Sequence, residues 1–181
     1  AIPLCLVGSE MCIRDRKKSL TTFLFHRSKI YPKLLWIAGL MDNIKNNLAN
    51  IRDGFSVLDG QDKLVYLIDL GKKLDHINES DRTEDRKIHA CTSQTWLKLG
   101  YENNLVTLKA FSESTIVKGL LRILQIGFNN SEKKSIINFI NSFDDPSSLF
   151  EWLNLGPAIS SQRQNGFLGS LKYIKRELDN A

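Results

Sequence analysis

The chain has 181 residues, of which 42% are apolar and 25% are charged, as in an ordinary globular protein. This length suits one domain with a real core and is short for two. The formal net charge of +5 arises within residues 1–40, which hold seven basic and two acidic side chains. The rest of the chain has 25 − 7 = 18 basic and 20 − 2 = 18 acidic residues and is therefore neutral. A neutral globular part has no positive excess to condense on phosphates, and no apolar stretch approaches the roughly 18 residues that span a bilayer. We therefore expect neither a nucleic-acid nor a membrane partner.

Residues 1–40 are interpreted as an N-terminal extension of the domain. The opening segment 1–16 resembles translated adapter sequence, which favours artefactual readthrough, whereas residues 17–40 are basic, contain serine and threonine and lack acids, as a transit peptide does. Met41 would make a natural start and gives a domain of residues 41–181. Readthrough implies a bacterial cytoplasm, and a transit peptide implies a plastid or another organelle.

Two helices are predicted at the start of the domain. Ile44, Leu48 and Ile51 recur at helical spacing and place one apolar stripe on a first helix that ends near Gly54. A second helix can open at Asp59 or Gln61, and its apolar residues continue to Leu74. Residues 75–86 are rich in charge and are expected to form a surface loop.

The next segments predict a β-hairpin. Residues 95–101 and 105–111 are separated by Glu102-Asn103-Asn104, a polar turn with two residues that tolerate a left-handed backbone. Trp96, at the start of the first strand, is expected to anchor the core.

The remaining chain predicts four helices. Ser112 or Ser114 can cap a helix whose residues 116–124 are apolar enough to be the central buried one. Ser131 would cap a shorter helix, and Pro146 suits the first turn of a brief one. A last amphipathic helix runs over about residues 164–178. The sum is a single α+β domain, in which a small antiparallel sheet is flanked by helices.

The cysteines single out one candidate reactive residue. Cys5, Cys12 and Cys91 make an odd count without a C-x-x-C pair or a His/Cys cluster at zinc-ligand spacing, so neither a disulfide framework nor a metal site is expected. The globular part holds only Cys91, as suits a reducing compartment. A thiolate is the reactive form and a free thiol has a pKa of about 8.5, so activation needs nearby cations or donors, for which Arg86 and His89 are close in sequence. Without further information a lone cysteine is more often a small buried apolar residue than a reactive one.

The residues around Cys91 resemble the signature Gly-Cys-Gln-Ser-Gln-Val-Trp of the SufE cysteine-desulfuration family, which includes the CsdE proteins. Here residues 90–96 are Ala-Cys-Thr-Ser-Gln-Thr-Trp. Three further segments resemble that family in the same order: the charged lead-in Arg82–His89, the central-helix segment Ile116–Leu120, and Ser161–Gly166. The likeness extends over about residues 62–178.

This resemblance implies a sulfur acceptor with a SufE-like fold. A partner cysteine desulfurase of the SufS or CsdA type would use pyridoxal phosphate to produce a persulfide, and Cys91 would take its sulfur, stimulate the desulfurase and pass the sulfur to an iron–sulfur scaffold of the SufBCD type. The cofactor belongs to the partner, so this chain is expected to bind none. It would be an accessory sulfur-transfer protein rather than a stand-alone enzyme.

The resemblance also implies supporting residues. His89, Ser93 and Gln94 lie in the expected loop around Cys91, and Arg163 would orient that loop or pair with a partner carboxylate. Lys118 and Gly119 are expected to serve close helix packing rather than contact with a partner. Ala90 and Thr92 depart from the signature, and alanine in place of glycine implies a more ordinary and stiffer loop backbone.

Two other classes of function remain open from the sequence. A thiol hydrolase would need a base within reach of Cys91, for which His89 and His76 are the domain's candidates. A non-catalytic binding module would recruit a partner with no chemistry at Cys91.

Overall fold

The computed structural model describes the backbone of residues 32–180 and the side chains of residues 43–180 apart from Pro157. Residues from Gly39 onward belong to one compact unit. Most of the extension predicted over residues 1–40, with Cys5 and Cys12, lies outside the described residues. In the described part, no helix combines the length and apolar character required to cross a membrane.

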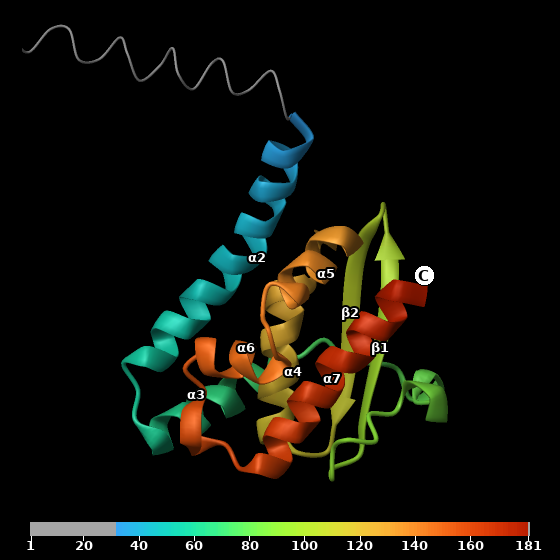
Figure 1. The fold of residues 1–181 in the computed structure, drawn as a ribbon. Helices are drawn as coiled ribbons and strands as arrows, with labels where there is room; N and C mark the ends of the chain where they lie inside the picture. Colours follow the sequence, from blue (N-terminus) through green and yellow to red (C-terminus); the bar gives the residue numbers. More distant parts are fainter. Residues whose placement is uncertain (1–31, 181) are drawn as a thin grey trace, which may run out of the picture. The chain divides into compact units, whose positions relative to one another are not determined.

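The domain has the predicted α+β architecture, with a three-stranded antiparallel sheet in the order β1-β2-β3 (Figure 1). The helices are α2 (Pro32–Ser56), α3 (Gly60–Gly71), α4 (Thr115–Phe128), α5 (Lys133–Asn141), α6 (Pro146–Trp152) and α7 (Ser161–Asn180). The strands are β1 (Thr95–Glu102), β2 (Leu105–Ser112) and β3 (Ser131–Glu132). Short 3-10 turns form η1 (Glu79–Asp81), η2 (Glu84–Arg86) and η3 (Gly156–Ala158). Helices α4 and α7 lie on one face of the β1–β2 hairpin (Figure 1).

The predicted hairpin is confirmed, and a third strand joins it. β1 and β2 pair from Thr95 opposite Ser112 to the turn, where Asn103 and Asn104 have φ of 52° and 65°. Two successive residues with positive φ match the right-handed twist of the flanking strands. The prediction that Ser131 caps a helix is wrong, because Ser131 pairs with Val106 in the short strand β3 and α5 begins after it, at Lys133.

Other helix ends follow the sequence signals. The side chain of Asp59 accepts a hydrogen bond from the backbone N–H of Asp62 at the start of α3, and Ser114 does the same for Val117 at the start of α4. Pro146 opens α6. The first and last helices are longer than predicted, since α2 begins at Pro32 and α7 begins at Ser161.

Helix α4 is the buried central helix, as its sequence predicts. It packs between the sheet, α3 and α7. It approaches α3 most closely. A Cβ placed on Gly119 of α4 would lie 2.2 Å from the backbone oxygen of Leu67 in α3. A Cβ placed on Gly71 of α3 would lie 2.9 Å from the backbone nitrogen of Gly119. The two helices therefore touch backbone to backbone, which only glycine permits.

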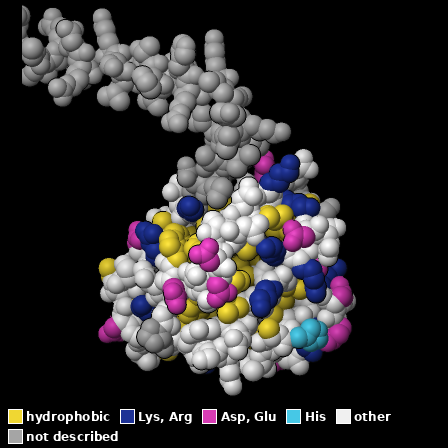
Figure 2. Space-filling model, viewed as in Figure 1, with side chains coloured by type: hydrophobic (Ala, Val, Ile, Leu, Met, Phe, Trp, Pro, Cys, Tyr) yellow, Lys and Arg dark blue, Asp and Glu magenta, His cyan; other side chains and the backbone are white. Residues whose placement is uncertain are grey.

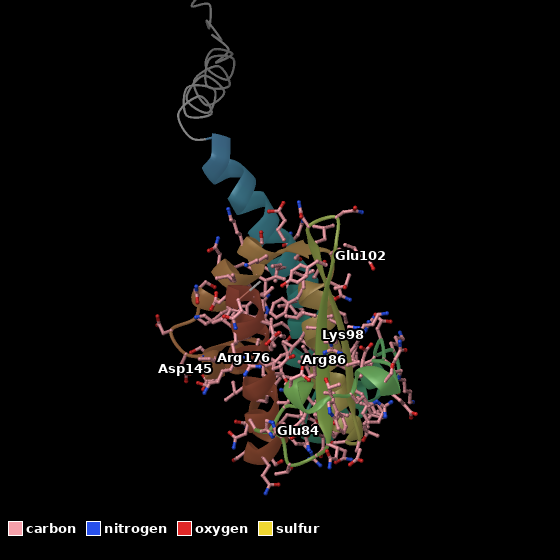
Figure 3. The ribbon with its side chains drawn as sticks, turned by 90° about the vertical axis from the view of Figure 1, so that its right-hand side faces the viewer. Glu84, Arg86, Lys98, Glu102, Asp145 and Arg176 are labelled. Carbon is pink, nitrogen blue, oxygen red and sulfur yellow. The ribbon has the colours of Figure 1, made fainter. Side chains whose placement is uncertain are left out.

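The charged segment before β1 is more than a surface loop, because it covers the outer face of the hairpin. Arg82 stacks 3.7 Å from the ring centre of Phe111. Asp81 accepts hydrogen bonds from Lys98 and Arg86, both at 2.8 Å, and the bond from Lys98 above all holds the pKa of Asp81 below its ordinary value. Figure 3 shows Arg86 and Lys98 close together where this segment meets β1.

Trp96 does not anchor the inner core. Its side chain is half-buried on the outer face of the hairpin, 6.1 Å from the ring of Phe111, and Lys87 lies over it. The alternation of β1 explains this placement, because the neighbouring Thr95 and Leu97 are the residues that point inward and are buried. The prediction for Trp96 is therefore corrected. On the face of the molecule in Figure 2, acidic and basic side chains are interspersed, as expected of a neutral domain.

Candidate functional site

Cys91 lies in a short loop that projects from a fixed base. The backbone N–H of Ile88 donates to the carbonyl of Thr95 at 2.9 Å, and both residues are almost fully buried, at 3% and 1% exposure. The N–H of Cys91 donates to the carbonyl of Ile88 at 3.1 Å, which closes a tight turn. Residues 89–93 therefore form the loop itself, between two ends that backbone hydrogen bonds hold in place.

The thiol of Cys91 is half-buried against α7. It packs against the edge of the hydrophobic core, and a Cβ placed on Gly166 would lie 2.9 Å from its Sγ. The missing side chain at Gly166 makes room for the sulfur. Cys91 is the free cysteine of the described domain.

A small polar cavity of about 160 Å³ opens beside this thiol. Its walls are Cys91, Thr92 and Ser93 from the loop, Ser114 and Val117 from the start of α4, and Ser160, Gln162 and Arg163 from the start of α7. Two helix N-termini thus face one space, and each carries partial positive charge. Within the described residues the guanidinium of Arg163 forms no ion pair, so its full charge is also available there. The cavity is suited to hold an anionic group close to Sγ.

The structure brings together only some of the residues proposed from the sequence. Ser93 and Arg163 line the cavity with Cys91. Gln94 is exposed and contributes its backbone carbonyl, which accepts from the N–H of Glu113 and fixes the end of the loop. His89 has a side chain that is 69% exposed, with Nε2 3.7 Å from a carboxylate oxygen of Glu84. The side chain of His89 is thus directed to the 3-10 turn before the loop. The roles of these residues stay predictions.

Neither histidine of the described domain forms a hydrogen bond with Cys91. His76 bridges to Ala110 of β2 and packs 6.4 Å from the ring centre of Phe111, while His89 lies beside Glu84. A Cys/His nucleophile needs the two side chains within hydrogen-bond reach. This geometry gives the hydrolase alternative no support.

The glycines on which the loop rests are not predicted from the sequence. Gly166 appears there only as the end of a motif and Gly169 has no role, yet both touch the loop. The sequence does contain a signal for them. Each glycine inside a helix lowers the stability of that helix by about 1 kcal/mol relative to alanine, so two glycines in one helical pattern indicate that close packing requires them. Ser114, Ser160 and Gln162 were missed as cavity walls because their contact with the loop is long-range.

The fold and the site define a class: a small α+β domain that presents one half-buried loop thiol beside a positively charged cavity. The family model described as "SufE: Fe-S metabolism associated domain" matches residues 49–178. The chain belongs to the SufE family, which is associated with iron–sulfur metabolism.

Two relatives agree with this family assignment, and one solved structure has the same fold. An uncharacterized SufE-like protein of Rhizobium meliloti (strain 1021) is 34% identical over 138 residues, which cover 74% of this chain and 95% of that protein. A second uncharacterized SufE-like protein, from Rhizobium etli, is 32% identical over 136 residues and covers 72% and 88%. The solution structure of a hypothetical protein from Thermus thermophilus has the same fold, with a TM-score of 0.56 and 16% identity over 75% of this chain and 95% of that one.

Proposed function

We propose that this protein accepts sulfur on Cys91 from the persulfide of a pyridoxal-phosphate-dependent cysteine desulfurase, of the SufS or CsdA type, and passes it to an iron–sulfur scaffold. The observation that carries the proposal is the position of Cys91, which stands in a short loop with its Sγ beside a small cavity that Arg163 lines. In this role the protein stimulates the desulfurase by removing its persulfide. It would act where that partner resides, in a bacterial cytoplasm or an organelle.

The proposed step is a thiol exchange. The Cys91 thiolate attacks the terminal sulfur of the donor persulfide, a bond forms between that sulfur and Sγ, the donor's sulfur–sulfur bond breaks, and the donor cysteine leaves as a thiolate. Sulfur changes carrier without an external oxidant or reductant. The second transfer, to the scaffold, repeats the same chemistry with Cys91 as the leaving thiolate.

The site supports both halves of a carrier's task. A persulfide is an anionic, oxidisable group, and half-burial against α7 limits the access of oxidants to it. The positive charge of Arg163 and of the two helix N-termini favours an anion at this position. Delivery requires the opposite, an exposed sulfur, and the loop of residues 89–93 can extend while its base at Ile88 and Thr95 is held in the core.

Intact mass spectrometry tests the proposal. The protein is incubated with a cysteine desulfurase, pyridoxal phosphate and L-cysteine, and we expect a gain of one or more sulfur atoms that a reducing agent removes. Cys91→Ser, which preserves the size of the side chain, should gain none and should not stimulate the desulfurase. Absence of any adduct on the native chain would end the carrier proposal. If Cys91→Ser stimulated the desulfurase as well as the native chain does, the protein would instead be a partner-binding module.

A further inference from the structure

Two glycines of α7 carry the Cys91 loop on one face of that helix. Gly166 and Gly169 are three residues apart and therefore lie on the same side. A Cβ placed on Gly166 would meet Sγ of Cys91 at 2.9 Å, and a Cβ placed on Gly169 would meet the Cβ of Ala90 at 2.5 Å. The thiol and the Ala90 methyl group thus occupy space that side chains on α7 would otherwise fill.

The two contacts differ in what they constrain. Sγ is the end of a side chain, so rotation about the Cα–Cβ bond of Cys91 can relieve pressure on it. The methyl group of Ala90 has no such rotation, so its position is the position of the loop backbone. The contact between Ala90 and Gly169 therefore fixes where the backbone beside Cys91 lies.

This contact acts on the movable part of the loop. Ile88 and Thr95 are buried and joined by a backbone hydrogen bond, whereas Ala90 is exposed on its other side. An outward movement of residues 89–93 must separate Ala90 from Gly169, and among the described residues the exposed side of Ala90 leaves room for that movement.

We propose that Ala90 and Gly169 form a steric latch that positions Cys91 against α7 and sets how readily the loop extends the thiol. The latch deepens the proposed sulfur-acceptor function, because it governs access to the residue that would carry the sulfur. It is a property of the free protein, so it can fail or hold independently of any sulfur transfer.

The test measures the rate at which iodoacetamide modifies Cys91 in the full chain, read from the mass of the Cys91 peptide, with no desulfurase present. Gly169→Ala should raise that rate about tenfold, because the new methyl group overlaps that of Ala90 and shifts the local opening equilibrium. Ala90→Gly should raise it less, by roughly twofold to threefold, because it only removes a contact.

The double variant Ala90→Gly/Gly169→Ala decides between a latch and a general disturbance. Without the Ala90 methyl group, the new Cβ at position 169 meets nothing closer than Cγ2 of Ile88 at 3.3 Å. Its modification rate should fall back to that of Ala90→Gly. A double variant that reacts as fast as Gly169→Ala, or an Ala90→Gly variant that reacts at the native rate, would overturn the proposal.

Gly60→Ala is the matched control, because a Cβ there meets nothing within 4 Å at the start of α3. It should leave the modification rate unchanged. Thermal unfolding of Gly169→Ala should show a midpoint close to that of the native protein, because the better helix propensity of alanine offsets most of the cost of the overlap with Ala90. A lowered midpoint that the double variant fails to restore would mean that the fold, and not a latch, had been disturbed, and would count against the proposal.

Discussion

At the scale of single residues, the site depends on charge beside the sulfur. Arg163 lines the cavity next to Cys91, and among the described residues it has no carboxylate partner. An unpaired guanidinium attracts anionic groups to the cavity, whether a persulfide or a carboxylate of a partner. Its neighbour Gln162 lines the same cavity and carries no charge.

Replacement of Arg163 should therefore change the charge selectivity of the thiol. We expect Arg163→Gln to lower the ratio of Cys91 modification by iodoacetate to that by iodoacetamide about fivefold, which corresponds to roughly 1 kcal/mol for two charges some ångströms apart near water. The ratio cancels any change in general accessibility. Gln162→Ala should leave the ratio as it is, and an equal fall in both variants would show that the charge of Arg163 has no part in the effect.

At the scale of elements, the crossing of α3 and α4 sets the position of the site. The N-terminus of α4 forms a wall of the cavity, and the close approach of Gly71 and Gly119 holds α4 in place. The sequence predicts a packing role for Gly119, and the structure confirms it. Lys118 beside it lies 5.5 Å from the ring centre of Phe111.

Gly119→Ala should separate these helices and destabilise the domain. The new Cβ would lie 2.2 Å from the carbonyl oxygen of Leu67, a backbone atom that cannot rotate away. We expect the free energy of unfolding, measured with urea, to fall by about 3 kcal/mol, as for other overpacked cores. Gly54→Ala is the control, because its Cβ would make ordinary contact with Tyr66 at 3.4 Å, and it should stabilise the protein by up to about 1 kcal/mol. Equal effects of the two variants would contradict the close packing of α3 against α4.

At the scale of the whole molecule, α7 joins the site to the rest of the domain. It contacts α4, α5, α6 and β1, and its first turns carry the Cys91 loop. Tyr173, farther along, is 8% exposed, and burial, with a smaller effect from Glu177, raises its pKa to about 12.

This raised pKa predicts a loss of stability in alkali. The ordinary pKa of tyrosine is 10.0, so between pH 10 and 12 the unfolded chain releases the Tyr173 proton while the folded chain still holds it. The contribution of Tyr173 to the free energy of unfolding is therefore fully present below pH 10 and is lost as the pH rises toward 12. Urea unfolding on both sides of pH 10 should show a smaller decrease for Tyr173→Phe than for the native protein. Tyr101→Phe is the comparison: the pKa of Tyr101 is also raised by burial, but its side chain is 46% exposed, so its variant should differ less from the native protein. Identical curves for Tyr173→Phe and the native protein would refute the assignment.

Periodic and capping signals made much of the fold predictable. The buried helix α4 follows from its apolar residues, the hairpin turn from Asn103 and Asn104, and the helix starts from Asp59 and Ser114. These features depend on interactions within a few residues, which a sequence displays directly. Trp96 and Ser131 were misplaced because the face of a strand and a pairing with β2 depend on distant segments.

By itself, the sequence determined the fold class, the family and the choice of Cys91 as the candidate reactive residue, because spacing and motif order are local properties of the chain. Only the tertiary structure decided what surrounds that thiol. Arg163 and Gly169 are more than seventy residues from Cys91 in the sequence, and they meet its loop only when α7 packs against it. It also turned His89 toward Glu84, although the sequence places it two residues from Cys91. Burial and charge around a side chain are sums over such long-range neighbours, so local pattern cannot supply them.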